Sequence, residues 1–313
     1  QVNHLPAPGE TVGDASFMQS LGGKGANQAV AAARLGGSVI FVTSLGNDMY
    51  ADILKKNFEK EGITTDYIIN DNQHPTGTAL IFVADSGENC IAVAPGANYS
   101  LSPESINHFS KVIDETEIVV MQAEIPYNTI KSIALLAQQK GKKVLFNPAP
   151  ACLIDAELMK AIDILVVNEV EAAFVSGIKH TGDNLEEIAE ALITAGAQNV
   201  VITLGSHGVY MKNAYTSGRL PSYKVNAIDT IAAGDTFCGA LAVMCAQKEI
   251  DIEALKFANA AAAIAVTRSG AQPSIPTLEE VNHFILKNEL PYRSTSKFNE
   301  HENLLEPTIH SIR

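Results

Sequence analysis

The sequence has few cysteines and an excess of acidic over basic residues. Its four cysteines, Cys90, Cys152, Cys238 and Cys245, show neither metal-ligand spacing nor a disulfide framework, which is typical of a reducing compartment. Lys and Arg number 22 against 35 Asp and Glu, and the net charge of -13 would repel nucleic acid and anionic membranes. We therefore expect a small-molecule partner, with no nucleic-acid partner and no membrane partner.

Long apolar segments are also missing. No stretch reaches the roughly 18 uninterrupted apolar residues of a membrane span, and the first residues lack a basic region followed by an apolar stretch. Neither a span nor a secretory signal is indicated, so we expect a cytoplasmic protein. At 313 residues and 46% hydrophobic content, the chain is long enough to bury a sizeable core.

Two common nucleotide-binding motifs are absent. The segment Gly22-Gly23-Lys24-Gly25 is not a P-loop, because neither Ser nor Thr follows the lysine and the glycine spacing differs. The fingerprint G-x-G-x-x-G after an early strand is not found. Its absence argues against a nicotinamide-dependent dehydrogenase.

The second half of the chain alternates between strand-like and helix-like patterns. Residues 143–146, 162–167 and Asn199–Thr203 have the short apolar pattern of buried strands. Leu185–Ala195 has the spacing of an amphipathic helix, and Gly196 stands at the expected C-cap. Such alternation is typical of parallel βαβ units. The sequence predicts an α/β fold, with a Rossmann-like, doubly wound, mostly parallel sheet flanked by helices.

A different pattern precedes this region. Thr78–Val83 and Asn89–Ala94 are strand-like and flank the turn signal Asp85-Ser86-Gly87, which predicts a hairpin. We expect it to form a small antiparallel β lid, to which residues 11–19 could add strands.

The ends of the chain complete the predicted organisation. The chain opens on polar and proline-rich residues, so we expect a leading buried strand to precede Gln1. One domain is expected over residues 1–290, with lid segments at about 1–21 and 76–97. Residues 291–313 are polar and weakly periodic and read as a tail without an assigned role.

The strongest chemical signal is the small-residue turn 229–237, which enters a helical pattern at Phe237. Unpaired backbone N–H groups and the positive end of the dipole meet at such a helix start, which suits a phosphoryl group. Ala232, Ala233 and Gly234 would allow close approach, and Asp235 could accept a proton from an attacking hydroxyl. An Asp before a helix is, however, more commonly an N-cap.

Polar residues follow other predicted elements. In residues 22–27, glycines at a helix start allow close approach of a ligand, with Lys24 and Asn27 as hydrogen-bonding groups. Glu124 follows the strand Ile118–Gln122, where it could bind sugar hydroxyls. An ordinary glycine turn explains the first segment equally well.

Two further segments end predicted strands. Asn168-Glu169-Val170-Glu171 suits hydrated Mg²⁺ near phosphates, or an N-cap with acidic residues in the first turn. Residues 203–208 carry glycines that could admit a nucleotide, or form a plain turn between two strands.

Together these segments resemble the ribokinase family of PfkB-type carbohydrate kinases, in the same order and at similar separations, to about Leu290. The resemblance is carried by residues 22–33, 146–151, 168–171, 229–241 and 258–276. Agreement across five ordered segments outweighs the alternative interpretation of each segment alone.

The resemblance implies an ATP-dependent kinase that phosphorylates ribose, a homodimer formed through the lid, and Asp235 as catalytic base beside an anion hole. The anion hole would be formed by the amides of Ala232, Ala233 and Gly234. The positions that match sugar ligands are Gly23, Lys24, Gly25, Asn27, Glu124 and Asp235. Those that match ATP ligands are Asn168, Thr203, Gly205, Ser206, Gly208, Gly234 and Asn259.

Metal ions are also implied by the resemblance. Mg²⁺ would accompany ATP, with Glu171 as a candidate ligand, and a monovalent cation, usually K⁺, would bind beside the anion hole. The positions matching the monovalent cation site are Asp229, Ile231, Ala265, Arg268, Gly270 and Ser274.

The sequence departs from the family pattern in two places, and alternatives stay open. Cys238 stands where the family more often has Asn, and the family's opening strand, with an Asn and an Asp that bind sugar, would precede Gln1. The substrate could be 2-deoxyribose, a fructose-type sugar or a nucleoside. The chain could also be an inactive sugar-binding or regulatory relative.

Overall fold

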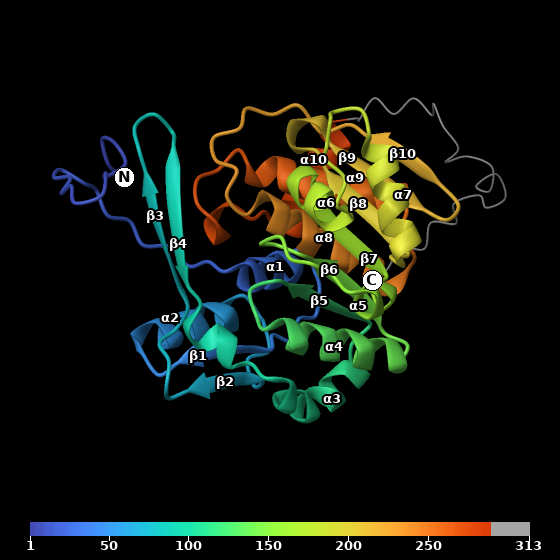
Figure 1. Cartoon of the computed structure of the whole chain (residues 1–313), viewed down its shortest axis with the longest axis horizontal. Helices are drawn as coiled ribbons and strands as arrows, with labels where there is room; N and C mark the ends of the chain where they lie inside the picture. The colour runs from blue at the N-terminus through green and yellow to red at the C-terminus, as the bar shows by residue number, and fades with distance from the viewer. Residues whose placement is uncertain (289–313) are drawn as a thin grey trace.

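The computed structural model describes residues 1–288, apart from the side chains of residues 105–108, so the predicted tail lies outside it. Its largest sheet has six strands in the order β10-β9-β8-β7-β6-β5 (Figure 1). The strands are β5 (Ile118–Gln122), β6 (Lys143–Asn147), β7 (Ile164–Asn168), β8 (Asn199–Thr203), β9 (Val209–Asn213) and β10 (Ser217–Leu220). β5 to β8 are parallel, and β9 and β10 run antiparallel to their neighbours. The mostly parallel sheet is confirmed.

Helices cover both faces of this sheet. Within β7, Leu165 and Val167 pack on one face with α4, α5 and α7, whereas Val166 packs on the other face with α8 and α9. Burial on both faces explains why these strands read as continuous apolar runs. The flanking helices are α3 (Ile106–Asp114), α4 (Tyr127–Gln139), α5 (Ala156–Lys160), α6 (Glu169–Ser176), α7 (Leu185–Ala195), α8 (Ala233–Gln247), α9 (Ile252–Ala265) and α10 (Leu278–Lys287). Among residues 1–288, none of the helices combines the length and apolar content needed to cross a bilayer.

A smaller unit packs beside the main sheet. It contains the parallel pair β1 (Thr43–Gly46) and β2 (Ile68–Asp71), with α1 (Lys24–Arg34) and α2 (Met49–Lys60). Val30, Leu45 and Phe58 belong to its own hydrophobic cluster. Because α1 also packs on α8, it joins this unit to the main body.

The contact between α1 and α8 depends on Gly239. A Cβ added there would lie 2.6 Å from the Cβ of Ala31 and 2.7 Å from the carbonyl oxygen of Gln28. Such contacts are far shorter than van der Waals separation, so only glycine allows the two helices to approach this closely. The close approach brings the first turns of both helices to the same place.

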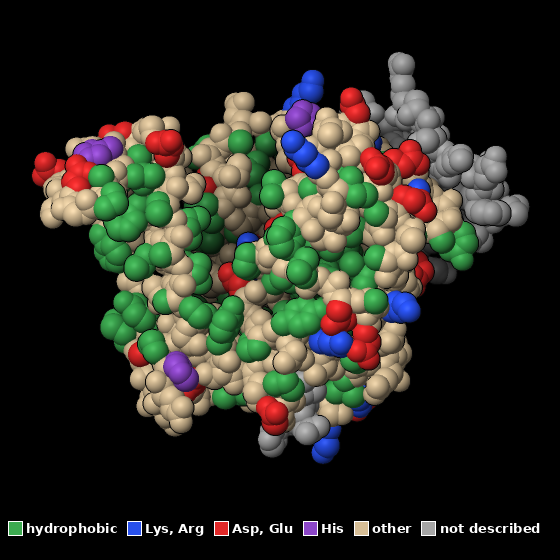
Figure 2. Space-filling model, in the orientation of Figure 1, with side chains coloured by type: hydrophobic (Ala, Val, Ile, Leu, Met, Phe, Trp, Pro, Cys, Tyr) green, Lys and Arg blue, Asp and Glu red, His purple; other side chains and the backbone are tan. Residues whose placement is uncertain are grey.

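The lid hairpin projects from the body (Figure 1). It consists of β3 (Thr78–Val83) and β4 (Asn89–Ala94), paired antiparallel with the predicted bounds. Its exposed large apolar side chains are Leu80, Ile81, Phe82, Ile91 and Val93. Figure 2 shows hydrophobic side chains gathered over the hairpin and a hollow between it and the main body.

Residues 11–19 form no strand, so the suggestion that they extend the lid is wrong. The bridge between Val2 and Ala84 is the contact that ties the first residues to the hairpin. The physical reason lies in the local sequence: Gly13 breaks the strand pattern, and Asp14 adopts a left-handed φ of 57° that no regular strand contains.

Candidate active site

A cavity of about 410 Å³ opens at the carboxyl ends of the central parallel strands, where open α/β sheets bind ligands. Helix α1 and helix α8 both begin at this place. The cavity is lined by Lys24, Asn147, Ala149, Val166, Val167, Asn168, Glu169, Val170, Glu171, Thr203, Gly205, Thr230, Ala232, Gly234, Asp235 and Cys238. Residues predicted to bind sugar and residues predicted to bind nucleotide therefore share one cavity.

The start of α8 has the geometry of an anion-binding turn. Ala232, the N-cap, lies in the left-handed region at φ 59° and ψ 10°, a conformation that costs a non-glycine residue about 1–2 kcal/mol. In the described part of the chain, the amides of Gly234 and Asp235 donate to no protein acceptor. The amide of Ala233 donates weakly to the carbonyl oxygen of Thr230 at 3.3 Å. Successive open amides at a helix start favour an anion.

Asp235 is placed inside the first turn of α8, so the N-cap interpretation of this residue is wrong. Asp235 is 7% exposed. Oδ2 accepts a hydrogen bond from Nδ2 of Asn27 at 2.9 Å, and Oδ1 accepts one from Nε2 of Gln28 at 3.1 Å. Two amide groups of α1 thus fix the orientation of the carboxylate, whose remaining lone pairs are open to the cavity.

Three residues of this network were not found from the sequence. Gln28 also donates to Oδ1 of Asn147 at 3.2 Å and accepts from Nε2 of Gln122 at 2.7 Å. Asn147 in turn donates to the carbonyl oxygen of Val166 at 2.9 Å. The sequence feature that could have indicated this network is the pair Asn27-Gln28. These two polar residues lie in an Ala-rich helix, in a stretch whose residues are buried.

Most of the residues predicted to bind sugar lie around the start of α1. Gly23 is the N-cap at φ 92°, and the backbone N–H of Lys24 donates to Oε2 of Glu124 at 2.8 Å. Burial raises the pKa of Glu124. Oδ1 of Asn27 is buried and has no partner among the described residues. An orphaned acceptor on the residue that binds the Asp235 carboxylate suits a ligand that carries hydroxyl groups.

Gly25 has a packing role in this turn. A Cβ on Gly25 would lie 2.9 Å from Oε1 of Gln122 and 3.5 Å from the ring of Phe41. Glycine therefore keeps α1 close to the end of β5, next to Glu124. Of the predicted sugar residues, Lys24 and Asp235 line the cavity, whereas the lining contains none of Gly23, Gly25, Asn27 and Glu124.

Asn168 and Glu171 form a capping box at the start of α6. Oδ1 of Asn168 accepts from the Glu171 amide at 2.8 Å, and Oε2 of Glu171 accepts from the Asn168 amide at 2.9 Å. Burial raises the pKa of Glu171. The alternative interpretation as a helix cap is thus confirmed, although both residues also line the cavity.

No cluster of three or more His, Cys, Asp or Glu side chains that could hold a metal ion occurs within the described residues. Asn168 and Glu171, the residues predicted to lie near Mg²⁺, line the cavity, and Mg²⁺ commonly binds through one or two carboxylates together with substrate phosphates and water.

The predicted nucleotide residues divide into two groups. Asn168, Thr203, Gly205 and Gly234 line the cavity. Ser206 lies in a short 3-10 turn, Gly205–His207, and Asn259 is buried in α9, donating to the carbonyl oxygen of Pro221 at 3.4 Å.

Gly208 is needed by the turn itself. Its φ is 94°, and a Cβ would lie 2.0 Å from the carbonyl oxygen of Leu220. The segment 203–208 is therefore the turn between β8 and β9 as well as part of the cavity wall.

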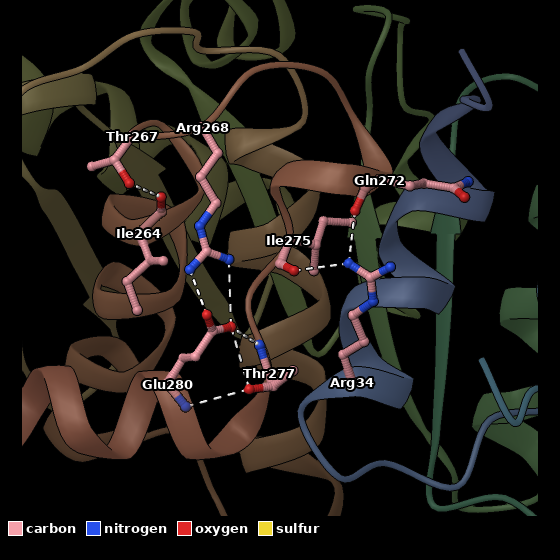
Figure 3. Close-up of polar contacts among 8 residues, drawn as sticks. All are labelled: Arg34, Ile264, Thr267, Arg268, Gln272, Ile275, Thr277 and Glu280. Atoms are coloured by element: carbon pink, nitrogen blue, oxygen red, sulfur yellow. Dashed lines mark hydrogen bonds and ion pairs between the residues drawn. The ribbon is translucent and has the colours of Figure 1, made fainter. Parts of the chain in front are cut away.

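The segment predicted to hold a monovalent cation is tied to the loop before α8. Asp229 accepts from the amides of Ile231 and Gly270, each at 2.9 Å. The side chain of Arg268 points away to Glu280, with Nη2 2.5 Å from Oε1, as Figure 3 shows. The guanidinium group of Arg268 contains no oxygen, so the atom that Arg268 can offer a cation is its backbone carbonyl oxygen. Carbonyl oxygens with one carboxylate form a donor set that suits K⁺.

Comparisons with known proteins identify the family of this chain. Residues 1–278 match the family described as "pfkB family carbohydrate kinase". The chain is 40% identical to the ribokinase of Haemophilus influenzae over 285 residues, which cover 91% of this chain and 93% of that protein.

Solved structures give the same result. The ribokinase of Thermotoga maritima superimposes with a TM-score of 0.83 at 42% identity, covering 92% of this chain and 94% of that chain. The Arabidopsis thaliana ribokinase complexed with ribose and ATP superimposes with a TM-score of 0.85 at 30% identity, covering 90% of this chain and 93% of that chain. The chain belongs to the pfkB family of carbohydrate kinases.

Proposed function

We propose that the protein transfers the γ-phosphoryl group of ATP to the primary hydroxyl of D-ribose, giving ribose 5-phosphate and ADP. The observation that carries this proposal is the position of Asp235 in the cavity, directly beside the open amides at the start of α8. A base and an anion site in one turn are what phosphoryl transfer to an alcohol requires.

The chemistry follows from these groups. The hydroxyl oxygen attacks the γ-phosphorus in line with the leaving group, while its proton passes to the carboxylate of Asp235. The bond between the γ-phosphorus and the bridging oxygen breaks, and ADP leaves with that electron pair. Hydrogen bonds from Asn27 and Gln28 hold the carboxylate so that its free lone pairs face the hydroxyl. The open amides of Gly234 and Asp235 stabilise charge on the transferring group.

Two cations support this transfer in the proposal. Mg²⁺ bound to the ATP phosphates would neutralise their charge near Asn168 and Glu171, with water between metal and protein. The segment holding Asp229, Gly270 and Ser274 would hold K⁺, which would order the loop that forms the anion site. We also place the protein in the cytoplasm, where ATP is available and where its free cysteines stay reduced.

The function is tested by measuring ATP consumption over a panel of ribose, 2-deoxyribose, fructose and nucleosides, with phosphorus NMR to locate the new phosphate. We expect the highest kcat/KM with ribose and the phosphate on its primary carbon. A higher kcat/KM with another acceptor would reassign the substrate within the family. Binding of ribose without turnover of any acceptor would identify a sugar-binding relative instead.

K⁺ is expected to raise kcat well above the value in Na⁺ or Tris alone. The reason is that Asp229 joins the cation segment to the loop before α8, so ordering one orders the other. The measurement is an initial-rate titration at constant ionic strength, with ATP and ribose saturating. Equal rates in the three buffers would contradict cation activation and leave the kinase proposal intact.

We further propose that the protein dimerises through the lid. An isolated two-stranded hairpin is marginal in water, and β3 and β4 expose five large apolar side chains that a second lid could bury. Ile81→Asp, a charge at the centre of this surface, is expected to weaken the dimer by about 10²-fold or more.

Light scattering across a concentration series measures this change. The matched control is Leu153→Asp, because Leu153 is 74% exposed on the main body. We expect the control to stay dimeric and Ile81→Asp to be monomeric. A monomeric wild type, or a dimer that tolerates Ile81→Asp, would exclude the lid interface.

A further inference from the structure

Arg34, in the last turn of α1, is bound to the segment 272–275 (Figure 3). Its Nη1 donates to the carbonyl oxygens of Gln272 at 2.7 Å and Ile275 at 2.8 Å. Its Nε and Nη2 donate to Glu61 at 2.8 and 2.6 Å, the bidentate arrangement of a strong ion pair. One guanidinium therefore joins α1, the end of α2 and the segment 272–275.

The charge of Arg34 is compensated locally. The Arg34 side chain is 23% exposed and that of Glu61 is 13% exposed, so solvent screens the pair only in part. The hydrogen bond from Arg34 lowers the pKa of Glu61, which keeps this carboxylate ionised beside the guanidinium. A cation in the neighbouring segment would consequently meet no uncompensated positive charge from Arg34.

The segment 272–275 is docked on the smaller unit. Gln272 is 3% exposed, and its Oε1 accepts from Nδ2 of Asn57 in α2 at 2.8 Å. Ile275 is 2% exposed and belongs to the cluster that contains Val30 and Phe58. The carbonyl oxygens that Arg34 binds are thus at the point where the segment touches α1 and α2.

A second residue holds the same stretch from the other side. Asp229 accepts from the Gly270 amide and also from the Ile231 amide, next to the start of α8. The residues from Gly270 to Ser274, which include two of the predicted cation ligands, therefore lie between two anchors. Asp229 ties them to the anion-binding turn, and Arg34 ties them to the helix that begins at the sugar loop.

We propose that Arg34 is a positioning residue for the monovalent cation: by binding the carbonyl oxygens of Gln272 and Ile275 it fixes the segment that carries the predicted cation ligands Gly270 and Ser274, so that cation affinity depends on α1. The proposal rests on the proposed cation activation. Arg34 does not touch the sugar, because α1 has 11 residues and a rise of about 1.5 Å per residue places it about 15 Å from Lys24. We therefore expect its effect on the reaction to be exerted through the cation segment and not through direct contact with the sugar.

The test compares wild type with Arg34→Met and Arg34→Lys in two K⁺ titrations. The first records kcat, and the second records amide hydrogen exchange of the peptide 264–277, with choline chloride keeping ionic strength constant. We expect Arg34→Met to need at least about 10-fold more K⁺ for half-maximal activation and for half-maximal protection, the scale of losing hydrogen bonds to a charged group. Arg34→Lys keeps the positive charge but loses the planar guanidinium group with its paired N–H donors. We expect its K⁺ midpoints to lie between those of wild type and those of Arg34→Met.

A merely structural role would not move these K⁺ midpoints. The ribose KM at saturating K⁺ is expected to stay within about twofold of wild type, since Asn27 and the Lys24 N–H that Glu124 binds lie in the first turn of α1, whereas Arg34 lies in its last turn. The control is Lys131→Met, which removes ion pairs to Asp155 and Glu157 at 3.0 and 2.6 Å and is expected to leave both midpoints unchanged.

The outcomes separate the two proposals. If the K⁺ midpoints of Arg34→Met equal those of wild type, the proposed role of Arg34 is overturned, while cation activation stands. A wild type that does not respond to K⁺ in either readout overturns both the cation site and the role of Arg34, while phosphoryl transfer stands. If Arg34→Met does not fold, the K⁺ titrations of kcat and of hydrogen exchange are carried out on Arg34→Lys. Midpoints equal to those of wild type in this variant would overturn the proposal equally.

Discussion

Asp235→Asn is expected to lower kcat by about 10²- to 10⁴-fold, the range for loss of a general base. Asn has nearly the same shape as Asp and its one oxygen can accept from either Asn27 or Gln28, but it cannot take up the proton of the attacking hydroxyl. The dissociation constants of ATP and ribose are expected to stay within about threefold of wild type, or about 0.6 kcal/mol. Single-turnover kinetics and calorimetric binding measure the two quantities separately.

Asp251→Asn supplies the matched control for this change. Asp251 is the N-cap of α9, where its side chain accepts from the Ala254 amide, and Asn caps helices as well as Asp does. Turnover of this variant is expected to equal that of wild type. Near-normal turnover in Asp235→Asn would remove Asp235 from the role of base, and loss of ATP binding would mean that its charge mainly organises the cavity.

Elements with a strong local pattern could be predicted from the sequence. The hairpin strands β3 and β4, the strand β8 and the helix α7 begin and end at the predicted residues. In each case a period of two or of 3.6 residues, or a turn with Gly, defines the element without help from distant residues. The parallel order of the sheet followed from the alternation of such elements.

The start of α8 could not be predicted in the same way. The helical pattern begins visibly at Phe237, but the helix itself begins at Ala233, after Ala232 has adopted a left-handed conformation. Alanine gives no local signal for such a backbone. The surrounding structure imposes it, as is common where strain is part of a binding site.

The hydrogen-bond network around Asp235 could not be predicted from the sequence for a different reason. Gln28 is 207 residues from Asp235 and 119 residues from Asn147, and only the packing of α1 on α8 at Gly239 brings them together. Side chains that meet through tertiary packing have no common period in the sequence. Asn168 and Glu171 illustrate the opposite case, because a capping box within one turn is local and was a stated alternative.

Glu124 is the residue on which we expect sugar binding to depend most. It already accepts a hydrogen bond from the backbone N–H of Lys24, so a sugar hydroxyl bound to its carboxylate would connect the end of β5 with the start of α1. A lid closed over sugar would exclude water, which is smaller and far more abundant than ribose and would otherwise accept the phosphoryl group. ATP hydrolysis without sugar should therefore be very slow in the wild type.

The pH dependence of this contact has a definite sign. Burial raises the pKa of Glu124 above its ordinary value of 4.5, so the side chain takes up a proton at a higher pH than an exposed glutamate. Protonation removes a charged acceptor, and the ribose KM should rise as pH falls toward the raised pKa. The free energy of unfolding changes in the opposite direction. The folded state binds this proton more tightly than the unfolded chain, so the contribution of Glu124 to stability is lost as pH rises through the raised pKa.

Glu124→Ala is expected to raise the ribose KM by about 10- to 100-fold, since a hydrogen bond to a charged group contributes about 1.5–3 kcal/mol. The KM for ATP should stay within about twofold, because the contacts of Glu124 lie at the start of α1 and not at α6 or β8. Glu124→Gln keeps the shape and should remove the rise of the ribose KM that the wild type shows as pH falls toward the raised pKa of Glu124, which steady-state kinetics at saturating ATP would measure. An unchanged ribose KM in Glu124→Ala would exclude Glu124 from the sugar site. Equal increases in both KM values would mean that it supports the cavity as a whole, through the Lys24 amide, rather than the sugar alone.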